Sequence, residues 1–136
     1  MSLYLDASVL VALLVEEAAS AEAQARIVGE TLLISDFAVA EFSAAIARRV
    51  RIGDMPAGQA PLTFQAFDSW AARATTRIGQ DPADAPRATA LVRRLDLGLR
   101  APDALHIAIA ERLAATLFTL DRPMARAATT LGLPLA

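Results

Sequence analysis

The stretch LYLDASVLVALLV, residues 3–15, decides how the chain is expected to fold. The short apolar run from Leu3 to Asp6 is followed by apolar side chains at helical spacing, which predicts a buried strand leading into a helix over residues 9–23. Asp6 lies inside this otherwise hydrophobic segment. Because a carboxylate among apolar neighbours is costly unless it is paired, bound to a metal or at a surface, Asp6 is the first candidate for a functional residue.

Strands and helices are expected to alternate along the rest of the chain. Further strands are predicted over residues 31–35, 115–120 and 133–135. Further helices are predicted after a cap at Ser35 or Asp36 up to residue 50, over residues 62–78 and 87–95, from Pro102 onward, and from Asp121 to a stop at Gly132. This alternation predicts an α/β fold with three layers, in which a short parallel sheet of four to five strands is flanked by helices.

Length and composition favour one cytoplasmic domain spanning residues 1–136. The longest apolar run, residues 9–15, is shorter than the roughly 18 residues of a membrane span, and no basic residue precedes it as in a signal peptide. No membrane partner is therefore expected. The chain contains no cysteine, which excludes disulfides and thiolate metal sites, and all thirteen basic residues are arginine, which excludes chemistry that needs lysine.

Four carboxylates lie in the most hydrophobic segments of the sequence. Asp6 and Asp121 each end an apolar strand, and the ligand site of an open parallel sheet lies beyond the carboxyl ends of its strands. Glu41 and Asp103 belong to the first turns of two predicted helices near the same edge. Each has an ordinary alternative, such as a helix-start or turn residue. Together the four are better explained as one site.

Crowded carboxylates repel one another, and a divalent cation would relieve that repulsion. Ligands that are all oxygen favour Mg²⁺ or Mn²⁺ over zinc, with either one or two metal ions. Such a site can activate water and stabilise the leaving oxygen of a phosphodiester. The residues therefore predict metal-dependent phosphodiester hydrolysis.

Four segments carry a resemblance to a known family. YLDASVLVALL, AVAEFSAAI, APDALHIAIA and LFTLDRPMARAATTLGLPL resemble, in order and spacing, the signature segments of PIN-domain ribonucleases, in particular the VapC toxins. The resemblance implies that Asp6, Glu41, Asp103 and Asp121 form a metal-binding quartet, with Ser8 and Thr119 as hydroxyls that orient a ligand or water. It also implies Mg²⁺-dependent endonucleolytic cleavage of RNA.

The same resemblance implies protein partners. It predicts a homodimer, a cognate VapB-like antitoxin whose tail covers the site, and a higher-order complex with that antitoxin. The net charge of −2 at first opposes RNA binding, but without the four site acids eleven acidic residues face thirteen arginines. Two arginine clusters are candidates for phosphate contacts, or else for a solvated helix face or an antitoxin contact: Arg48, Arg49 and Arg51, and Arg93, Arg94 and Arg100.

His106, the only histidine, lies three residues after Asp103 and so on a similar helix face. A packed or supporting role is favoured over that of a general base. Two other functions are alternatives to a ribonuclease. A haloacid-dehalogenase-type phosphatase also begins with a strand-end aspartate, but its chemistry normally uses a lysine. A catalytically silent PIN fold acting as a binding module would show neither metal affinity nor RNA cleavage.

Overall fold

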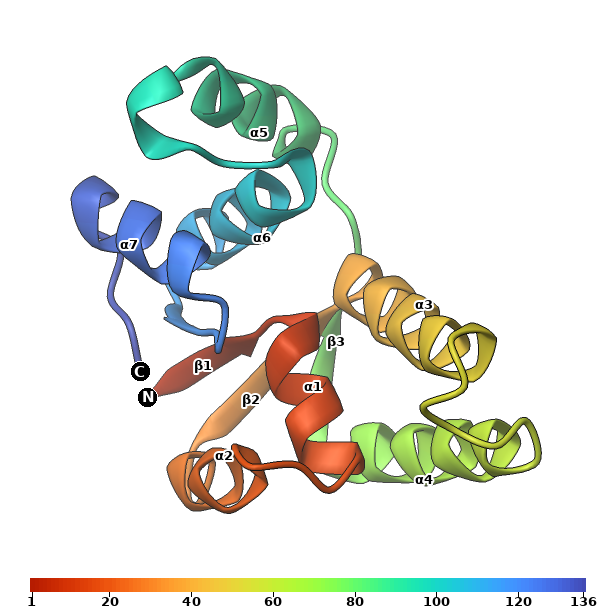
Figure 1. Ribbon diagram of the computed structural model, residues 1–136. Coiled ribbons are helices and arrows are strands. Elements are labelled where there is room, and N and C mark those ends of the chain that lie inside the picture. Colours follow the sequence, from red (N-terminus) through yellow and green to blue (C-terminus); the bar gives the residue numbers. More distant parts are fainter.

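Four parallel strands form the centre of the computed structural model, which describes residues 1–136 (Figure 1). They are β1 (Ser2–Leu5), β2 (Thr31–Ser35), β3 (Thr75–Ile78) and β4 (Thr116–Phe118). Their order across the sheet is β3-β2-β1-β4. Leu3 of β1 consequently pairs with Leu32 on one side and with Thr116 on the other. The predicted parallel sheet is confirmed.

Helices cover both faces of this sheet (Figure 1). They are α1 (Ala7–Leu14), α2 (Ser20–Arg26), α3 (Asp36–Arg51), α4 (Gln59–Ala74), α5 (Asp84–Arg93), α6 (Ala101–Arg112) and α7 (Arg122–Leu131), with a short 3₁₀ helix η1 (Leu95–Leu97) after α5. None of these helices has both the length and the apolar character that a membrane span requires.

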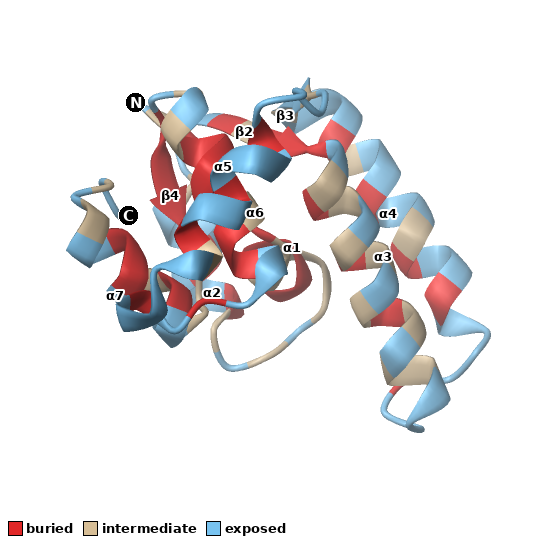
Figure 2. Cartoon of the chain, turned by 90° about the horizontal axis from the view of Figure 1, so that it is seen from above, coloured by how far each residue is buried: buried red, intermediate tan, exposed pale blue.

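Two hydrophobic cores lie on opposite faces of the sheet, and β1 contributes to both. Leu3 and Leu5 pack with residues of α1 to α4, whereas Tyr4 between them packs with residues of α5 to α7. Figure 2 shows the buried residues of the strands and helices in red. This alternation follows from the two-residue period of a strand. In the first core, Phe42 of α3 stacks on Phe67 of α4 with ring centroids 4.4 Å apart. The predicted three-layer arrangement is confirmed.

The prediction of one helix over residues 62–78 is wrong in its last turn. The helix α4 ends at Ala74, and residues Thr75–Ile78 form the edge strand β3, which pairs with β2 from Leu32 to Ser35. The physical reason is that the edge of β2 offers backbone partners, and the β-branched Thr75 and Thr76 suit a pleated strand. Apolar spacing alone did not reveal this change because β3 is mostly exposed.

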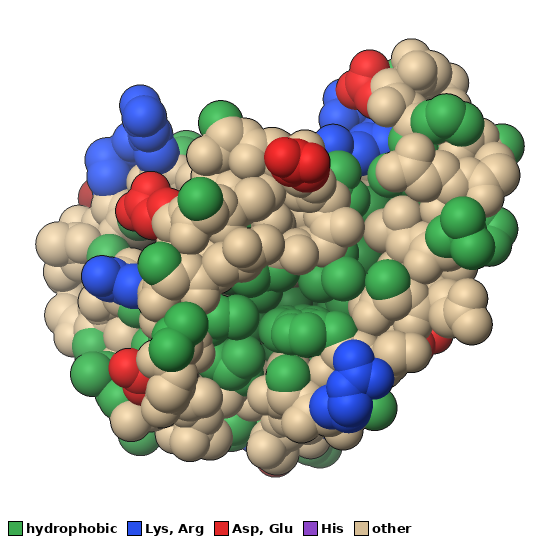
Figure 3. All heavy atoms as spheres, turned by 90° about the horizontal axis from the view of Figure 1, so that it is seen from below, with side chains coloured by type: hydrophobic (Ala, Val, Ile, Leu, Met, Phe, Trp, Pro, Cys, Tyr) green, Lys and Arg blue, Asp and Glu red, His purple; other side chains and the backbone are tan.

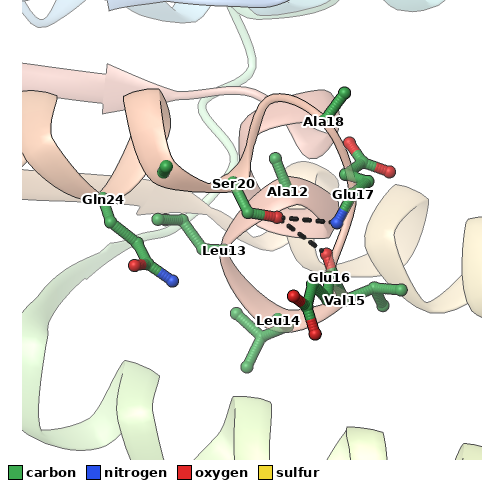
Figure 4. A pocket seen from close by; sticks show the side chains of 10 residues that line it. Ala12, Leu13, Leu14, Val15, Glu16, Glu17, Ala18, Ser20 and Gln24 are labelled. Carbon is green, nitrogen blue, oxygen red and sulfur yellow. Dashed lines mark hydrogen bonds between the residues drawn. The ribbon is translucent and has the colours of Figure 1, made fainter.

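The predicted continuous helix over residues 9–23 is also wrong, because the chain breaks between α1 and α2. Val15 is extended, and the hydroxyl of Ser20 bridges the turn by donating to the Val15 carbonyl and accepting from the Glu17 N–H (Figure 4). Leu13 and Gln24 line a cavity of about 410 Å³ beside this turn. Because of this break, α1 ends at Leu14. Asp6 directly precedes its first residue.

The ends of two other elements differ from the sequence predictions. The helix α5 begins at Asp84 rather than at residue 87, because Pro86 is accommodated in its first turn. The predicted strand over residues 133–135 is reduced to a single bridge between Leu117 and Leu135. Gly132 ends α7 as predicted, with a left-handed φ of 75° that favours glycine.

Candidate active site

The predicted site residues come from elements that surround the carboxyl edge of the sheet. Asp6 directly follows β1, and Asp121 lies three residues beyond the end of the neighbouring strand β4. Glu41 belongs to α3, which follows β2 without a gap, and Asp103 lies in the first turn of α6. Each carboxylate is therefore set on a rigid element near its terminus.

Asp6 is buried with only 2% of its surface exposed, and its carboxylate accepts three hydrogen bonds. Oδ1 accepts from the Val9 N–H at 3.1 Å and from the Ser8 hydroxyl at 2.6 Å, while Oδ2 accepts from the Thr119 hydroxyl at 2.6 Å. Burial raises the pKa of the Asp6 carboxyl, and the two hydroxyls act in the opposite direction. An ionised carboxylate offers about four acceptor positions, so one remains free.

Ser8 and Thr119 join the start of α1 to the loop after β4. The Ser8 hydroxyl accepts the N–H of Leu120 at 2.9 Å, and the Thr119 hydroxyl accepts the N–H of Asp121 at 3.0 Å. Both hydroxyls donate to Asp6 at the same time. These bonds fix the position of Asp121 relative to Asp6, although the two residues lie far apart in the sequence.

Three of the four acids also hold the start of a helix. Asp6 accepts the N–H of Val9 in α1, Asp121 accepts that of Met124 in α7, and Asp103 accepts the N–H of Arg100 immediately before α6. The helix-start interpretation of Asp103 is thus correct, and the structure shows that Asp6 and Asp121 are helix caps as well. In Asp6 and Asp121 the second carboxylate oxygen contacts a different residue, Thr119 and Arg100 respectively, whereas both oxygens of Asp103 bind Arg100. Capping therefore orients the carboxylates as well as stabilising the helices.

Arg100 provides a positive charge among the acids. Its guanidinium bonds to Asp103 at 3.1 and 3.3 Å, and its Nη2 atom lies 3.8 Å from Oδ2 of Asp121. The hydrogen bonds that Arg100 donates to Asp103, with smaller effects of the Asp121 and Glu41 charges, raise the pKa of Arg100. Because the Arg100 side chain is 75% exposed, its ion pairs are screened by solvent and contribute little free energy. The structure thus brings Asp103 and Asp121 together through an arginine.

Glu41 is held by a chain of buried hydrogen bonds. Its Oε2 lies 2.5 Å from Nε2 of His106, and Nδ1 of His106 lies 2.8 Å from the Tyr4 hydroxyl. That hydroxyl in turn lies 2.8 Å from Oγ of Ser35, which caps α3 by accepting the N–H of Ala38. A neutral His106 that donates from Nε2 and accepts at Nδ1 satisfies every partner. The supporting role predicted for His106 agrees with these contacts.

The carboxylate oxygens of the site suit a divalent cation in their chemistry but not in their present contacts. Carboxylate oxygens are ligands suited to Mg²⁺ and Mn²⁺, and Asp6 retains an acceptor position. No three acidic or histidine side chains, however, lie close enough to form a complete ligand group. The Arg100 guanidinium is bonded to two of the acids instead. The residues fit the cation chemically, provided that Arg100 moves away.

Sequence reasoning did not identify Tyr4 and Ser35 as the support of Glu41, nor Arg100 as the partner of the acids. A hydroxyl in the middle of a buried strand, two residues before Asp6, was the available signal for Tyr4, because such a group requires a partner. Arg100 offered the signal of a cation three residues before Asp103, a spacing at which side chains meet on a helix.

A parallel α/β fold with an acidic carboxyl edge defines the class of this protein. Residues 3–129 match the sequence profile of the PIN domain, and the chain belongs to the PIN-domain family. This membership excludes the haloacid-dehalogenase alternative. No curated protein sequence matches the chain significantly.

Solved structures share this fold over nearly the whole chain. A chain of VapBC2 from Rickettsia felis, bound to promoter DNA, is 18% identical with a TM-score of 0.71 and covers 100% of this chain and 98% of its own. VapC20 from Mycobacterium tuberculosis, a sarcin-ricin loop cleaving toxin, is 16% identical with a TM-score of 0.71, covering 92% and 94%. VapBC-1 from Haemophilus influenzae is 16% identical with a TM-score of 0.67, covering 100% and 97%.

Proposed function

We propose that the chain is a metal-dependent endoribonuclease and the toxin of a VapBC-type toxin–antitoxin pair. The observation that carries the proposal is the arrangement of the acids. Asp6 is tied through Thr119 to the loop of Asp121, and Arg100 joins Asp121 to Asp103. Glu41 belongs to the same electrostatic environment because it contributes to the raised pKa of Arg100.

Mg²⁺ or Mn²⁺, when bound, would activate water and offset charge on the phosphodiester and its leaving oxygen. Asp6, Asp103, Asp121 and Glu41 are proposed to hold the cation. Ser8 and Thr119 keep Asp6 in one orientation by two short hydrogen bonds. His106 and Tyr4 restrict Glu41 in the same way. Such fixed positions lower the cost of reorganising the site during the reaction.

An antitoxin partner is part of the proposal. Figure 3 shows a hollow lined by hydrophobic side chains on the face below α2 and α4. Leu13 and Leu14 of α1, which line the cavity beside α2, are only partly buried. An amphipathic helix of a partner protein could cover such a surface. The similarity in fold to chains from VapBC complexes supports this assignment, and homodimerisation stays a prediction.

A catalytically silent binding module is the second candidate. It is favoured by one observation, namely that Asp103 and Asp121 are already neutralised by Arg100 and no three potential ligands form a metal group. In that case the ion pairs would be purely structural. The two functions differ in whether RNA is cut.

The deciding experiment uses the purified chain and a mixed cellular RNA. We expect cleavage with Mg²⁺, arrest by EDTA, and a loss of at least about 100-fold in Asp6→Asn. The matched control is Asp68→Asn, because Asp68 is an exposed acid on α4, outside the site. Cleavage by Asp6→Asn at the wild-type rate would contradict the mechanism. Absent cleavage would favour the binding module, whereas metal-independent cleavage would contradict the metal-dependent mechanism.

The toxin role needs its own test. Expression of the chain alone should arrest growth, and co-expression with the product of a small neighbouring reading frame should relieve the arrest. A folded chain that is harmless on its own, and has no such partner, would contradict the role while leaving ribonuclease activity to be judged separately.

A further inference from the structure

A cavity of about 290 Å³ opens beside the acidic edge, between α1 and α3. It is lined by Ser8, Val11, Glu17, Ala45, Arg48, Arg49 and Leu120. Ser8 joins this cavity to the site, because its hydroxyl donates to Asp6 and accepts from the N–H of Leu120. A strand bound at the acids therefore has a continuous path into the cavity past Ser8.

The arginines that the sequence suggests for phosphate contacts differ in whether they form an ion pair with a carboxylate. Arg49 pairs with Glu17 at 2.9 Å, on the cavity wall itself, and Arg94 pairs with Asp96 at 2.7 Å. Arg100 is paired with the site acids. The arginines of the two clusters without a carboxylate partner are Arg48, Arg51 and Arg93.

The three unpaired arginines differ in which cavity they line. Arg93 lines a different cavity of about 350 Å³, formed by α5 and the start of α6, whose lining includes no residue with a side-chain hydrogen bond to a site acid. Arg51 does not line the cavity beside Ser8, whereas Arg48 does. Arg48 is exposed, so that its guanidinium is available to a ligand. Arg48 alone combines an unpaired charge with a place on the path from the acids.

We propose that the cavity beside Ser8 is a subsite for a backbone phosphate of single-stranded RNA, with Arg48 as its cation. This inference rests on the proposed ribonuclease function. Site acids repel a polyanion, and a nearby cation without a carboxylate partner offsets that repulsion. Arg48 lines the same cavity as the Glu17–Arg49 pair, whose charges already neutralise each other. The subsite holds the strand next to the cleaved bond.

The test measures RNA binding without divalent cation, so that binding is separated from cleavage. A fluorescently labelled, short single-stranded RNA is titrated with the full chain in EDTA, and its anisotropy gives the dissociation constant at several salt concentrations between about 50 and 200 mM. In Arg48→Ala we expect weaker binding and a salt slope lower by about 0.7, the change for one lost phosphate contact on a single strand. Arg48→Lys should retain most of the slope.

Arg51→Ala is the matched control, because it removes the same charge from the same helix outside the cavity. It should leave the slope at the wild-type value. Equal effects of the two alanine variants, an unchanged slope in Arg48→Ala, or no RNA binding by the wild type would each overturn the subsite. Binding of a protein partner, rather than RNA, that depends on Arg48 would do so too. Circular dichroism checks that the exposed-site variants are folded.

The two proposals fail separately. If RNA binds through Arg48 but is never cut with Mg²⁺, the subsite stands and the ribonuclease function fails. If RNA is cut but Arg48→Ala binds as the wild type does, the ribonuclease function stands and the subsite fails.

Discussion

The Nε2 atom of His106 lies 2.5 Å from Oε2 of Glu41, so a helix of one core fixes a site acid carried by a helix of the other. The Tyr4 hydroxyl completes this contact from the central strand between the two cores. Positioning of Glu41 consequently depends on two residues that are buried in the core, Tyr4 and His106.

Tyr4→Phe removes this hydroxyl but keeps the ring that fills the core. We expect RNA cleavage to fall about 10- to 100-fold, the usual effect of losing a residue that orients a metal ligand. The double variant Tyr4→Phe/Glu41→Gln should cleave no more slowly than Glu41→Gln alone, because both changes act through one side chain. Rates measured under identical Mg²⁺ concentrations check this. Losses that multiply would show that Tyr4 acts independently of Glu41.

Arg100→Ala removes the cation that competes for Asp103 and Asp121. We expect the affinity for Mn²⁺, measured by titration calorimetry on the protein without RNA, to rise about two- to fivefold, as befits an exposed ion pair. Arg93→Ala controls for the loss of a positive charge at an exposed position without a carboxylate partner. Unchanged or weaker Mn²⁺ binding in Arg100→Ala would show that Arg100 does not compete with the metal.

The pair of Asp84 and Arg112 should make stability depend on pH. Burial raises the pKa of the Asp84 carboxyl, but hydrogen bonds from Arg112 at 2.7 and 2.9 Å, with one from the Asp81 N–H, outweigh burial and hold that pKa below its usual value. The pair therefore stabilises the fold above about pH 4, the ordinary value of aspartate, and this contribution is lost as the pH falls through the lower folded-state pKa.

Asp84→Asn tests this linkage through urea unfolding at a series of pH values. We expect a loss of about 1 to 3 kcal/mol at pH 7, because the variant leaves the Arg112 guanidinium without its anion. The difference from the wild type should shrink at pH values well below 4. A difference that stays constant over the acid range would mean that packing, not charge, accounts for the loss.

Asp6→Asn should stabilise the metal-free fold. Because burial raises the pKa of Asp6, the ionised carboxylate destabilises the native state at neutral pH, and a neutral side chain of similar shape removes that penalty. We expect a higher midpoint of thermal unfolding at pH 7 in EDTA, with the gain declining at acid pH, where the wild-type carboxyl is protonated. Asp68→Asn, at an exposed position of α4, should change the midpoint little. A lowered midpoint in Asp6→Asn would contradict this account.

Much of the fold was predictable because its central strands are short apolar runs that end in a charged or capping residue. The patterns of residues 3–6 and 31–35 predict β1 and β2 in this way. The edge strand β3 was not predictable, because Thr75–Ile78 is mostly exposed and takes its conformation from pairing with β2. Pairing with a distant segment leaves no signal in the local apolar spacing.

The positions of the four acids followed from strand ends and helix starts, but their contacts did not. Asp103 and Asp121 meet through Arg100, whose reach depends on the packing of α6 against α7. The bond between Glu41 and His106 depends on the way that α3 and α6 meet across the edge of the sheet. Such contacts arise from tertiary packing, which a one-dimensional pattern does not specify.

The central place of β1 has a consequence for synthesis of the chain. Leu3 pairs with Thr116, so β1 finds one of its two neighbours only when the much later strand β4 has been made. Until then Thr119 and Asp121 are missing beside Asp6. A nascent or truncated chain that lacks β4 and α7 would carry an open strand edge on β1 and an incomplete set of the four acids.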